Sequence, residues 1–267
     1  MRERVAVVTG AAGGIGYALC ERFAAEGMHV VLADVSAAAV TTAAERLAAE
    51  SGAETLAVPT DVSRWEEVDE LERRTLERFG AAHVLCNNAG VQMPGKAWEF
   101  TRAEWEWLLG VNLGGVVHGI ASFLPGMIAR GEPGHVVNTA SIGGLLAHPR
   151  TAMYTASKYA VVGLSETLAH DLAAQGSPIG VSVLCPGGTV SMLRENSAAL
   201  RPGGEHGRPV PLVTHRDRIP AVDVAAAVVD AIREDRFWIL THPVYNDLIL
   251  ERAAGIVETG ALVAAVS

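Results

Sequence analysis

The chain has 267 residues, a length compatible with one large domain or two small ones. It has 21 Lys and Arg residues against 30 Asp and Glu, a net charge of −9 at pH 7, so we expect no nucleic-acid partner and no membrane partner. Hydrophobic residues make up 49% and charged residues 19%, which excludes a disordered chain. The three cysteines, Cys20, Cys86 and Cys185, form no C-x-x-C pair, so we expect neither a disulfide framework nor a metal site.

Short apolar runs alternate with helix-length segments along the whole chain. We predict strands at Val5–Thr9, His29–Ala33, Thr55–Val58, His83–Asn87, His135–Asn138, Gly180–Leu184 and Phe237–Leu240. We predict helices, with Ser36, Ser63 and Thr101 among their N-caps, at Ile15–Glu26, Ala37–Glu50, Glu66–Phe79, Arg102–Ala129, Ala152–Ala174 and Val222–Arg233. Strands that are apolar throughout are typical of a parallel sheet covered by helices on both faces. The sequence therefore predicts an α/β fold, a single doubly wound (Rossmann-like) parallel sheet of about seven strands, as one domain over residues 1–267.

Two segments bear on whether the protein meets a membrane. Gly110–Ala129 is a run of 20 residues without a charge, which is long enough to span a bilayer, but it contains Asn112, His118, Pro125 and five glycines. We therefore expect a buried helix there. The N-terminus passes from Met1 through three charged residues directly into an apolar run, so we expect no signal peptide and a cytoplasmic protein.

Residues 191–220 interrupt the alternation, with four prolines and few periodic apolar residues. A loop of about 30 residues in a compact domain is usually functional or disordered, so we expect a substrate-binding loop or lid within the domain. Five arginines stand here against three acidic residues, and we weigh a substrate carboxylate that binds one of them against a simply solvated lid. The arginines are Arg194, Arg201, Arg208, Arg216 and Arg218, and the apolar side chains that would cover a substrate are Met192, Leu193, Leu200, Leu212 and Val213.

A glycine-rich loop, Thr9-Gly10-Ala11-Ala12-Gly13-Gly14-Ile15-Gly16, follows the first predicted strand. Such glycines allow a sharp turn and bring backbone N–H groups to a pyrophosphate at the N-terminus of the next helix. Asp34 ends the second strand, 18 residues beyond Gly16, where a carboxylate can accept both hydroxyls of an adenine ribose. The same carboxylate would repel the 2′-phosphate of NADP, and neither positions 11–13 nor Val35 supplies the Arg or Lys that binds it. The sequence therefore favours NAD, with NADP as the weaker candidate.

Tyr154 and Lys158 are four residues apart and so lie on one face of a predicted helix. A free tyrosine has a pKa near 10 and is a poor base at neutral pH. A cation at about 4 Å stabilises the phenolate by roughly 4 kcal/mol, enough to bring the pKa toward 7. Taken alone, such a pair is commonplace and usually structural.

Together these motifs resemble the short-chain dehydrogenase/reductase family, over about residues 5–190. The glycine loop matches TGxxxGxG, residues 87–90 match NNAG, and residues 154–158 match YxxSK, all in the family's order. The family's PGxVxT occurs with a serine, Ser191, at its last position, which keeps the hydroxyl. No match is evident beyond about Met192.

The resemblance implies roles for individual residues. Tyr154 would exchange a proton with the carbonyl or alcohol oxygen, Ser141 would bind that oxygen, and Lys158 would hold the nicotinamide ribose and lower the pKa of Tyr154. Asn112 would hold a water in a proton relay. The catalytic set is thus Asn112, Ser141, Tyr154 and Lys158. The cofactor-binding set is Gly10, Ala12, Gly14, Ile15, Gly16, Asp34, Asp61, Val62, Asn88, Ala89, Gly90, Tyr154, Lys158, Pro186, Gly187, Thr189 and Ser191.

Our first hypothesis is an NAD(P)-dependent oxidoreductase that prefers NAD and acts on a secondary alcohol or ketone, of alicyclic, steroid-like or terpenoid type. The alternatives are a 3-oxoacyl-thioester (acyl carrier protein) reductase and a catalytically silent NAD-binding sensor or scaffold. Trp98, Trp105, Trp107 and His148 could flank the site, although ordinary packing explains each of them as well. The family implies a homodimer or homotetramer, for which the uncharged Gly110–Ala129 helix offers a face.

Overall fold

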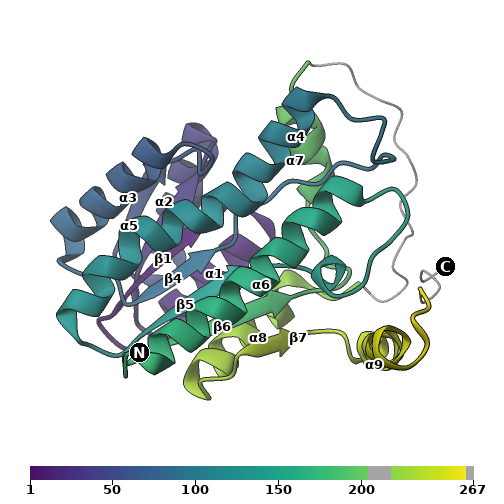
Figure 1. The fold of residues 1–267 in the computed structure, drawn as a ribbon. Coiled ribbons are helices and arrows are strands. Elements are labelled where there is room, and N and C mark those ends of the chain that lie inside the picture. Colours follow the sequence, from purple (N-terminus) through teal and green to yellow (C-terminus); the bar gives the residue numbers. More distant parts are fainter. Residues whose placement is uncertain (204–217, 263–267) are drawn as a thin grey trace.

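Seven parallel strands form one sheet in the computed structural model of the chain, which describes residues 1–203 and 218–262 (Figure 1). The strand order is β3-β2-β1-β4-β5-β6-β7. The strands are β1 (Val5–Thr9), β2 (His29–Asp34), β3 (Thr55–Pro59), β4 (Val84–Asn87), β5 (Gly134–Thr139), β6 (Ile179–Cys185) and β7 (Trp238–Leu240). The order reverses at β1, which lies between β2 and β4, and such a switch point opens a crevice at the carboxyl ends of the strands. The predicted doubly wound α/β fold is confirmed.

All seven predicted strands are present, with ends within one residue of those expected. β1 is buried along its whole length, from Val5 to Thr9, which is why its sequence is continuously apolar. Its register pairs Val7 with Val31 of β2 on one side and with Leu85 of β4 on the other. Central strands of this kind can be predicted from a continuous run of apolar residues, because helices cover both faces of the sheet.

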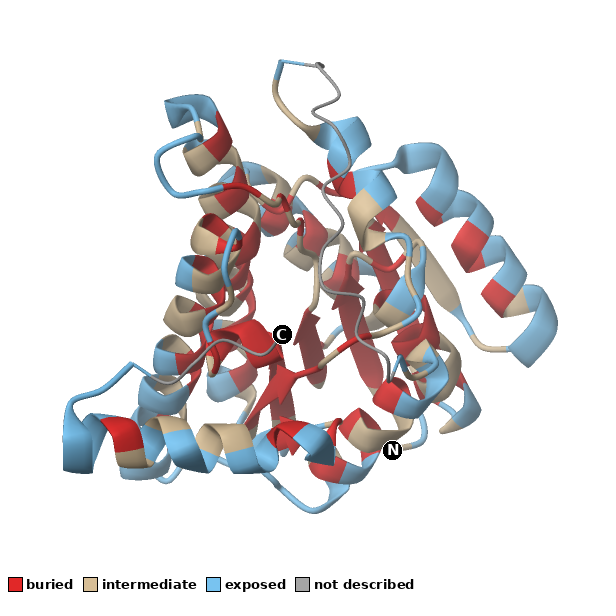
Figure 2. Ribbon diagram, turned by 90° about the vertical axis from the view of Figure 1, so that its right-hand side faces the viewer, coloured by how far each residue is buried: buried red, intermediate tan, exposed pale blue. Residues whose placement is uncertain are grey.

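Helices cover both faces of the sheet. α1 (Gly14–Ala25), α2 (Ala37–Ser51) and α8 (Ala221–Arg233) pack on one face, and α3 (Trp65–Phe79), α5 (Gly115–Arg130) and α6 (Ala152–Ala174) pack on the other. The remaining helical segments are α4 (Arg102–Leu109), α7 (Leu193–Leu200), α9 (Asn246–Ala254), the π-helical η1 (Gly110–Gly114) and η4 (Gly255–Thr259), and the 3-10 turns η2 (Ile142–Gly144) and η3 (Pro243–Tyr245). Figure 2 shows the buried strands enclosed by helices whose outer faces are exposed.

The segment predicted as one helix over Arg102–Ala129 is divided. α4 runs into a π-helical turn, η1, before α5 begins, so the hydrogen-bond pattern shifts around Asn112. A π-turn inserts an extra residue into the helix, often at a functional site, and hydrophobic periodicity does not reveal it. Gly110–Ala129 was predicted to be a buried helix, but it is only partly buried. In the most apolar 18-residue window of Arg102–Arg130, 39% of the window is buried.

Length and hydropathy alone would let Arg102–Arg130 cross a membrane. This is weak evidence, because core helices of soluble proteins meet the same criterion. The inner side of α5 packs Val116, Phe123 and Met127 against the sheet, as a core helix does.

Two of the three predicted N-caps are confirmed. Ser36 accepts a hydrogen bond from the Ala39 N–H, and Thr101 forms a capping box with Glu104. The prediction for Ser63 was wrong, because Arg64 occupies the N-cap position of α3. The Ser63 hydroxyl instead donates to the Asp61 carboxylate at 2.7 Å.

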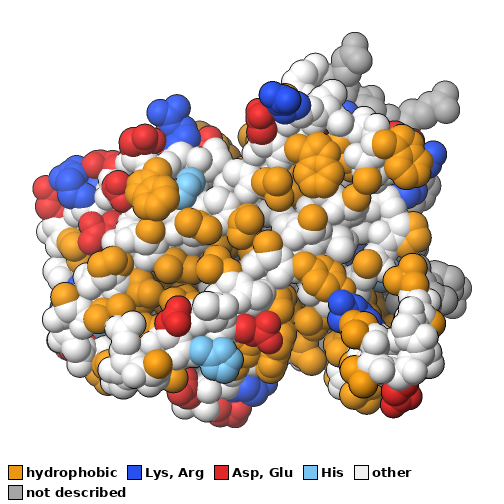
Figure 3. Space-filling view, viewed as in Figure 1, with side chains coloured by type: hydrophobic (Ala, Val, Ile, Leu, Met, Phe, Trp, Pro, Cys, Tyr) orange, Lys and Arg blue, Asp and Glu red, His pale blue; other side chains and the backbone are white. Residues whose placement is uncertain are grey.

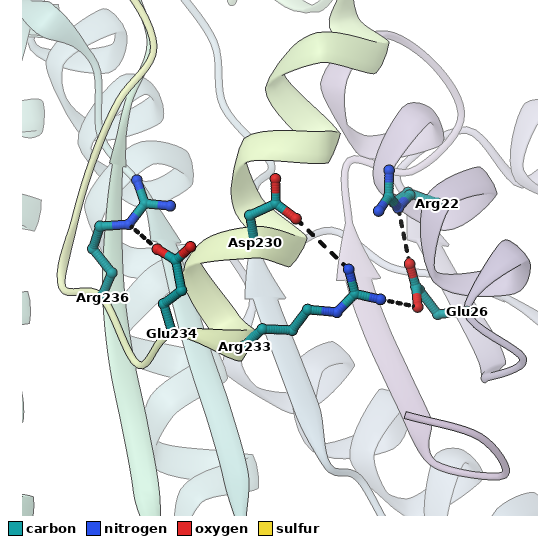
Figure 4. A network of polar contacts seen from close by, with 6 residues as sticks. All are labelled: Arg22, Glu26, Asp230, Arg233, Glu234 and Arg236. Carbon is teal, nitrogen blue, oxygen red and sulfur yellow. Dashed lines mark hydrogen bonds and ion pairs between the residues drawn. The ribbon is translucent and has the colours of Figure 1, made fainter.

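A polar network joins the ends of α1 and α8 at the amino edge of the sheet (Figure 4). Glu26 accepts from Arg22 at 3.1 Å and also pairs with Arg233, which lies 3.7 Å from Asp230. The network bridges residues 207 apart in sequence, and so ties the first helix to the last one on this face.

Candidate active site

A cleft of about 1380 Å³ crosses the carboxyl edge of the sheet. Every residue predicted to bind the cofactor lines it, together with Ser141. The residues come from the ends of β1 to β6 and from the loops that follow, so the topology itself gathers motifs that are far apart in sequence. Asn112 is the one predicted catalytic residue that lies behind the cleft wall.

The glycine loop has the geometry of a phosphate cradle. Gly10 has φ +64°, and a Cβ at Gly16 would lie 2.0 Å from the Gly10 carbonyl oxygen, so no larger residue fits that turn. α1 then begins at Gly14 with no side chain capping its first turn. Its free N–H groups and the helix dipole suit a diphosphate, so this part of the site fits a dinucleotide.

Asp34 lies at the far end of this cradle. One carboxylate oxygen accepts from the Ala12 N–H and the other from the Ser36 N–H, each at 3.1 Å. Its neighbour Val35 is 49% exposed and brings no charge. The carboxylate is therefore fixed beside the glycine loop, where it can accept from the hydroxyls of a sugar.

Thr9 joins the ends of β1 and β4, a role that the sequence did not suggest. Its hydroxyl accepts from the Asn88 N–H at 3.0 Å and from the Ala89 N–H at 3.1 Å. The Asn88 side chain returns a bond to the Thr9 carbonyl at 2.9 Å. The glycine loop and the NNAG segment are thus locked together.

Ser141 and Tyr154 lie side by side at the other end of the cleft. The Ser141 hydroxyl accepts from the Gly143 N–H at 3.1 Å and lies 3.5 Å from the Pro186 carbonyl. Burial raises the pKa of Tyr154 above its usual value, although a hydrogen bond with Ser141 acts in the opposite direction. Tyr154 stands in the first turn of α6, which points its ring at the Ser141–Gly143 turn.

Lys158 is buried one turn further along α6. Its ammonium donates to the Thr139 carbonyl at 2.7 Å and lies 5.7 Å from the centre of the Tyr154 ring. Burial lowers its pKa to about 8. Burial disfavours the charged form of both groups, and it therefore acts against the lowering of the Tyr154 pKa that we expected from Lys158.

Asn112 acts on the backbone of the cleft wall. Its side-chain oxygen accepts from the Val91 N–H at 2.8 Å, while its amide donates to the Val91 carbonyl at 2.9 Å and to Ser157 at 3.0 Å. A Cβ on the neighbouring Gly90 would lie 3.4 Å from the Asn112 oxygen and 3.7 Å from the Lys158 nitrogen. The π-turn η1 therefore presents an amide that ties the NNAG segment to α6.

The predicted lid contains a helix, α7, that the sequence did not indicate. Ser197 accepts from the Gln92 N–H at 2.9 Å, and Arg201 pairs with the buried carboxylate of Glu104 in α4. Met192, Leu193, Arg194, Leu200 and Arg218 line the cleft, whereas residues 204–217, with Arg208, Leu212, Val213 and Arg216, lie outside the described part of the chain.

Of the four ring side chains that could flank the site, two line the cleft and two do not. Trp107 and His148 line the cleft, and burial lowers the pKa of His148. Trp105 packs edge-on against Phe100, and Trp98 is 81% exposed. Within residues 1–203 and 218–262, no group of three or more His, Cys, Asp or Glu side chains is placed to hold a metal ion.

The sequence model described as "short chain dehydrogenase" matches residues 4–201. The chain belongs to the short-chain dehydrogenase/reductase family. It is therefore an oxidoreductase of the alcohol dehydrogenase and ketone reductase type, in a family that uses NAD or NADP. The match continues through α7 to Arg201, beyond Met192, where we expected the resemblance to end.

Similar proteins cover nearly the whole chain. A "CLA biosynthesis dehydrogenase/reductase" of Lactiplantibacillus plantarum is 34% identical over 97% of this chain and 95% of its own. A "1-deoxy-11-beta-hydroxypentalenate dehydrogenase" of Streptomyces avermitilis is 36% identical over 91% of this chain and 86% of its own. A short-chain dehydrogenase/reductase from Burkholderia phymatum, solved in complex with NAD, is 39% identical with a TM-score of 0.92, and covers 100% of this chain and 98% of its own.

Proposed function

We propose that this protein is an NAD-preferring dehydrogenase that interconverts a secondary alcohol and its ketone, with Tyr154 as the acid/base. The observation that carries the proposal is that one cleft is lined by the glycine loop, by the carboxylate of Asp34 and by Ser141, Tyr154 and Lys158. When bound, the nicotinamide would accept or give the hydride. The rest of the chemistry belongs to side chains of this chain.

The Tyr154 phenol would exchange a proton with the substrate oxygen, and the Ser141 hydroxyl would hold that oxygen in place. Ser141 is itself oriented by the Gly143 N–H, so its proton is directed away from that bond. Lys158 would hold the nicotinamide ribose, and Asn112 would keep the wall beside it rigid through Val91. A free tyrosine has a pKa near 10, so acid/base work near pH 7 requires that the groups around Tyr154 and the bound cofactor lower this pKa.

The preference for NAD rests on Asp34. Its carboxylate lies beside Ala12, where the 2′-phosphate of NADP would meet like charge, and Val35 offers no cation in compensation. The NAD complex of the similar Burkholderia phymatum protein supports this choice.

The cofactor proposal is tested by exchanging the charge. Asp34→Ser combined with Val35→Arg should raise kcat/KM for NADP and lower it for NAD, reversing the preference. Val35→Ser, a change at the same exposed position without charge, is the control and should leave the preference unchanged. A wild-type enzyme that prefers NADP would contradict the proposal directly.

For the substrate, we propose an alicyclic, steroid-like or terpenoid secondary alcohol. The cleft is large, and Trp107, Met192, Leu193 and Leu200 give its outer end an apolar lining. The hydroxypentalenate dehydrogenase of Streptomyces avermitilis, a similar protein, is named for a hydroxy acid. A substrate of this size would occupy the space between Tyr154 and α7.

We also propose that Arg194 binds a carboxylate of that substrate. Arg194 lines the cleft in the first turn of α7, and its pKa is lowered by burial and by the nearby charge of Arg218. Two neighbouring cations on a cleft wall favour an anionic ligand. Arg194→Gln should raise KM for a hydroxy acid but not for its methyl ester, and Arg102→Gln on the exposed side of α4 should change neither. An equal effect on the acid and the ester would contradict this role, and a raised KM for NAD would point to the diphosphate instead.

The alternatives make different predictions. A 3-oxoacyl-thioester reductase would use NADPH, and the charge around Asp34 argues against that cofactor. A silent sensor would bind the dinucleotide without turnover, although Ser141, Tyr154 and Lys158 all reach the cleft. We further propose a cytoplasmic homodimer or homotetramer; the free thiols of Cys20, Cys86 and Cys185 suit a reducing compartment.

A further inference from the structure

His242 is a buried histidine that neither the sequence motifs nor the proposed chemistry uses. It follows β7 and is 5% exposed. Its Nδ1 lies 3.1 Å from the Gly187 nitrogen and 2.8 Å from the Thr241 hydroxyl, and its Nε2 lies 3.0 Å from the Gly188 carbonyl oxygen. One imidazole thus contacts two successive residues of the Pro186–Thr189 loop.

These contacts determine where the ring proton lies. The Gly188 carbonyl can only accept, so Nε2 carries the hydrogen and donates it. The Gly187 N–H can only donate, so Nδ1 is the acceptor. The imidazole therefore presents one donor and one acceptor, which are matched to adjacent peptide groups.

The same loop is held from its other side by the catalytic turn and by the chain after the lid. The Pro186 carbonyl accepts from the Ile142 N–H at 2.9 Å, directly after Ser141. The Gly188 carbonyl also accepts from the Ile219 N–H at 3.0 Å. A Cβ at Gly187 would lie 2.8 Å from the His242 ring, so the loop and the imidazole are in close contact.

We propose that His242 is a positioning residue that sets the Pro186–Thr189 loop for the nicotinamide half of the cofactor. The inference rests on the proposed function, in which this loop faces the nicotinamide. In the proposed function, His242 touches neither cofactor nor substrate. It acts through the backbone of Gly187 and Gly188, and hence on the placement of Thr189.

Binding of two ligands, NAD and ADP-ribose, distinguishes this positioning role from a general loss of protein stability. NAD carries the nicotinamide, whereas ADP-ribose lacks it and still occupies the glycine loop and Asp34. His242→Phe keeps a ring of similar size but loses both hydrogen bonds. Calorimetry should show Kd for NAD raised about fivefold to tenfold, the equivalent of roughly one or two net hydrogen bonds, and Kd for ADP-ribose unchanged within about twofold.

Two further variants each keep half of the imidazole's contacts. Asn places an oxygen near Nδ1 and keeps the acceptor for the Gly187 N–H, whereas Gln places an amide near Nε2 and keeps the donor to the Gly188 carbonyl. The Gly188 carbonyl retains Ile219 as a donor in both variants. His242→Asn should therefore bind NAD more tightly than His242→Gln.

A second buried histidine provides the matched control. His135 lies at the amino end of β5, away from the cleft, with its Nε2 2.7 Å from the Ser182 hydroxyl. His135→Phe should lower Tm without changing Kd for either ligand. Equal weakening of NAD and ADP-ribose in His242→Phe, or no weakening of NAD, would overturn the inference alone. A wild-type protein that binds ADP-ribose and NADP but not NAD would overturn the proposed cofactor. The role of His242 would then be tested by comparing the Kd values of NADP and ADP-ribose in His242→Phe.

Discussion

At the residue scale, burial acts on both members of the pair Tyr154 and Lys158, which we propose to be catalytic. Removal from water raises the pKa of the phenol and lowers the pKa of the ammonium to about 8, so both groups tend toward their neutral forms. Proton transfer at neutral pH needs the opposite at Tyr154. We infer that the bound cofactor, whose ribose would engage Lys158, completes the electrostatic arrangement.

The buried Lys158 predicts a pH dependence of stability. Its pKa falls from 10.5 to about 8 on folding, so the cost of burying the charge is fully present below pH 8 and is lost as the pH rises toward 10.5. Relative to Lys158→Met, which has no charge to bury, the wild type should gain on the order of 2 kcal/mol in unfolding free energy between pH 7 and pH 10. Urea unfolding of both proteins at each pH measures this, and a difference that stays constant with pH would contradict it.

At the scale of elements, α7 is fastened over the cleft by two contacts. Ser197 accepts from the backbone of Gln92, and Arg201 pairs with Glu104, whose side chain is 5% exposed. Burial disfavours the charged Glu104, but hydrogen bonds from Thr101 and Arg201 outweigh it and lower the pKa of this carboxyl. The pair thus persists at neutral pH and is lost only as the pH falls below the usual range of a glutamate.

Breaking this pair should loosen the substrate end of the site. We expect Arg201→Gln to raise KM for the alcohol by roughly 30-fold, which corresponds to about 2 kcal/mol. The reason is that the buried Glu104 carboxylate then lacks its partner and α7 loses this attachment. Kd for NAD should change little. Arg73→Gln in α3, which breaks an exposed pair with Glu70, is the control. An unchanged KM for the alcohol would show that α7 does not depend on this pair.

The elements differ in how far the sequence predicts them. β1 and β4 to β6 are rich in buried apolar residues because helices cover both faces, and their ends could be predicted within one residue. η1 could not be predicted, because a π-turn changes hydrogen bonding without changing the apolar pattern. α7 was missed because it buries only Ser197 and so has no apolar stripe.

The candidate site likewise contains residues that the sequence predicts and residues that it does not. Gly16 and Asp34 could be found because tight turns and sugar-binding carboxylates require particular residue types at a fixed spacing. Thr9 and His242 act through backbone groups distant in sequence, and no local pattern marks them. Contacts that depend on tertiary structure have to be read from the fold.

At the scale of the whole molecule, hydrophobic side chains gather on the face that carries α5 and α6 (Figure 3). Val117 and Ile128 of α5 are 36% and 37% exposed there. An apolar face of this kind is suited to contact with another protein. In a family that is typically oligomeric, it is the surface that we propose for self-association.

Charges on this face should dissociate the assembly. Val117→Lys combined with Ile128→Lys is expected to reduce the molar mass by light scattering to that of the 28.0 kDa chain, because buried like charges would face each other across the interface. Thr42→Lys on the exposed side of α2 should leave the mass of the wild type unchanged. A double variant that keeps the wild-type mass would place the interface elsewhere.

NAD-dependent oxidation with Tyr154 as the acid/base is tested most directly by absorbance at 340 nm with NAD or NADP across cyclic, steroidal and terpenoid secondary alcohols. The wild type should turn over with NAD in preference to NADP, and Tyr154→Phe should lower kcat by about 100-fold or more while Kd for NAD stays the same. Turnover that survives in Tyr154→Phe would contradict the claim.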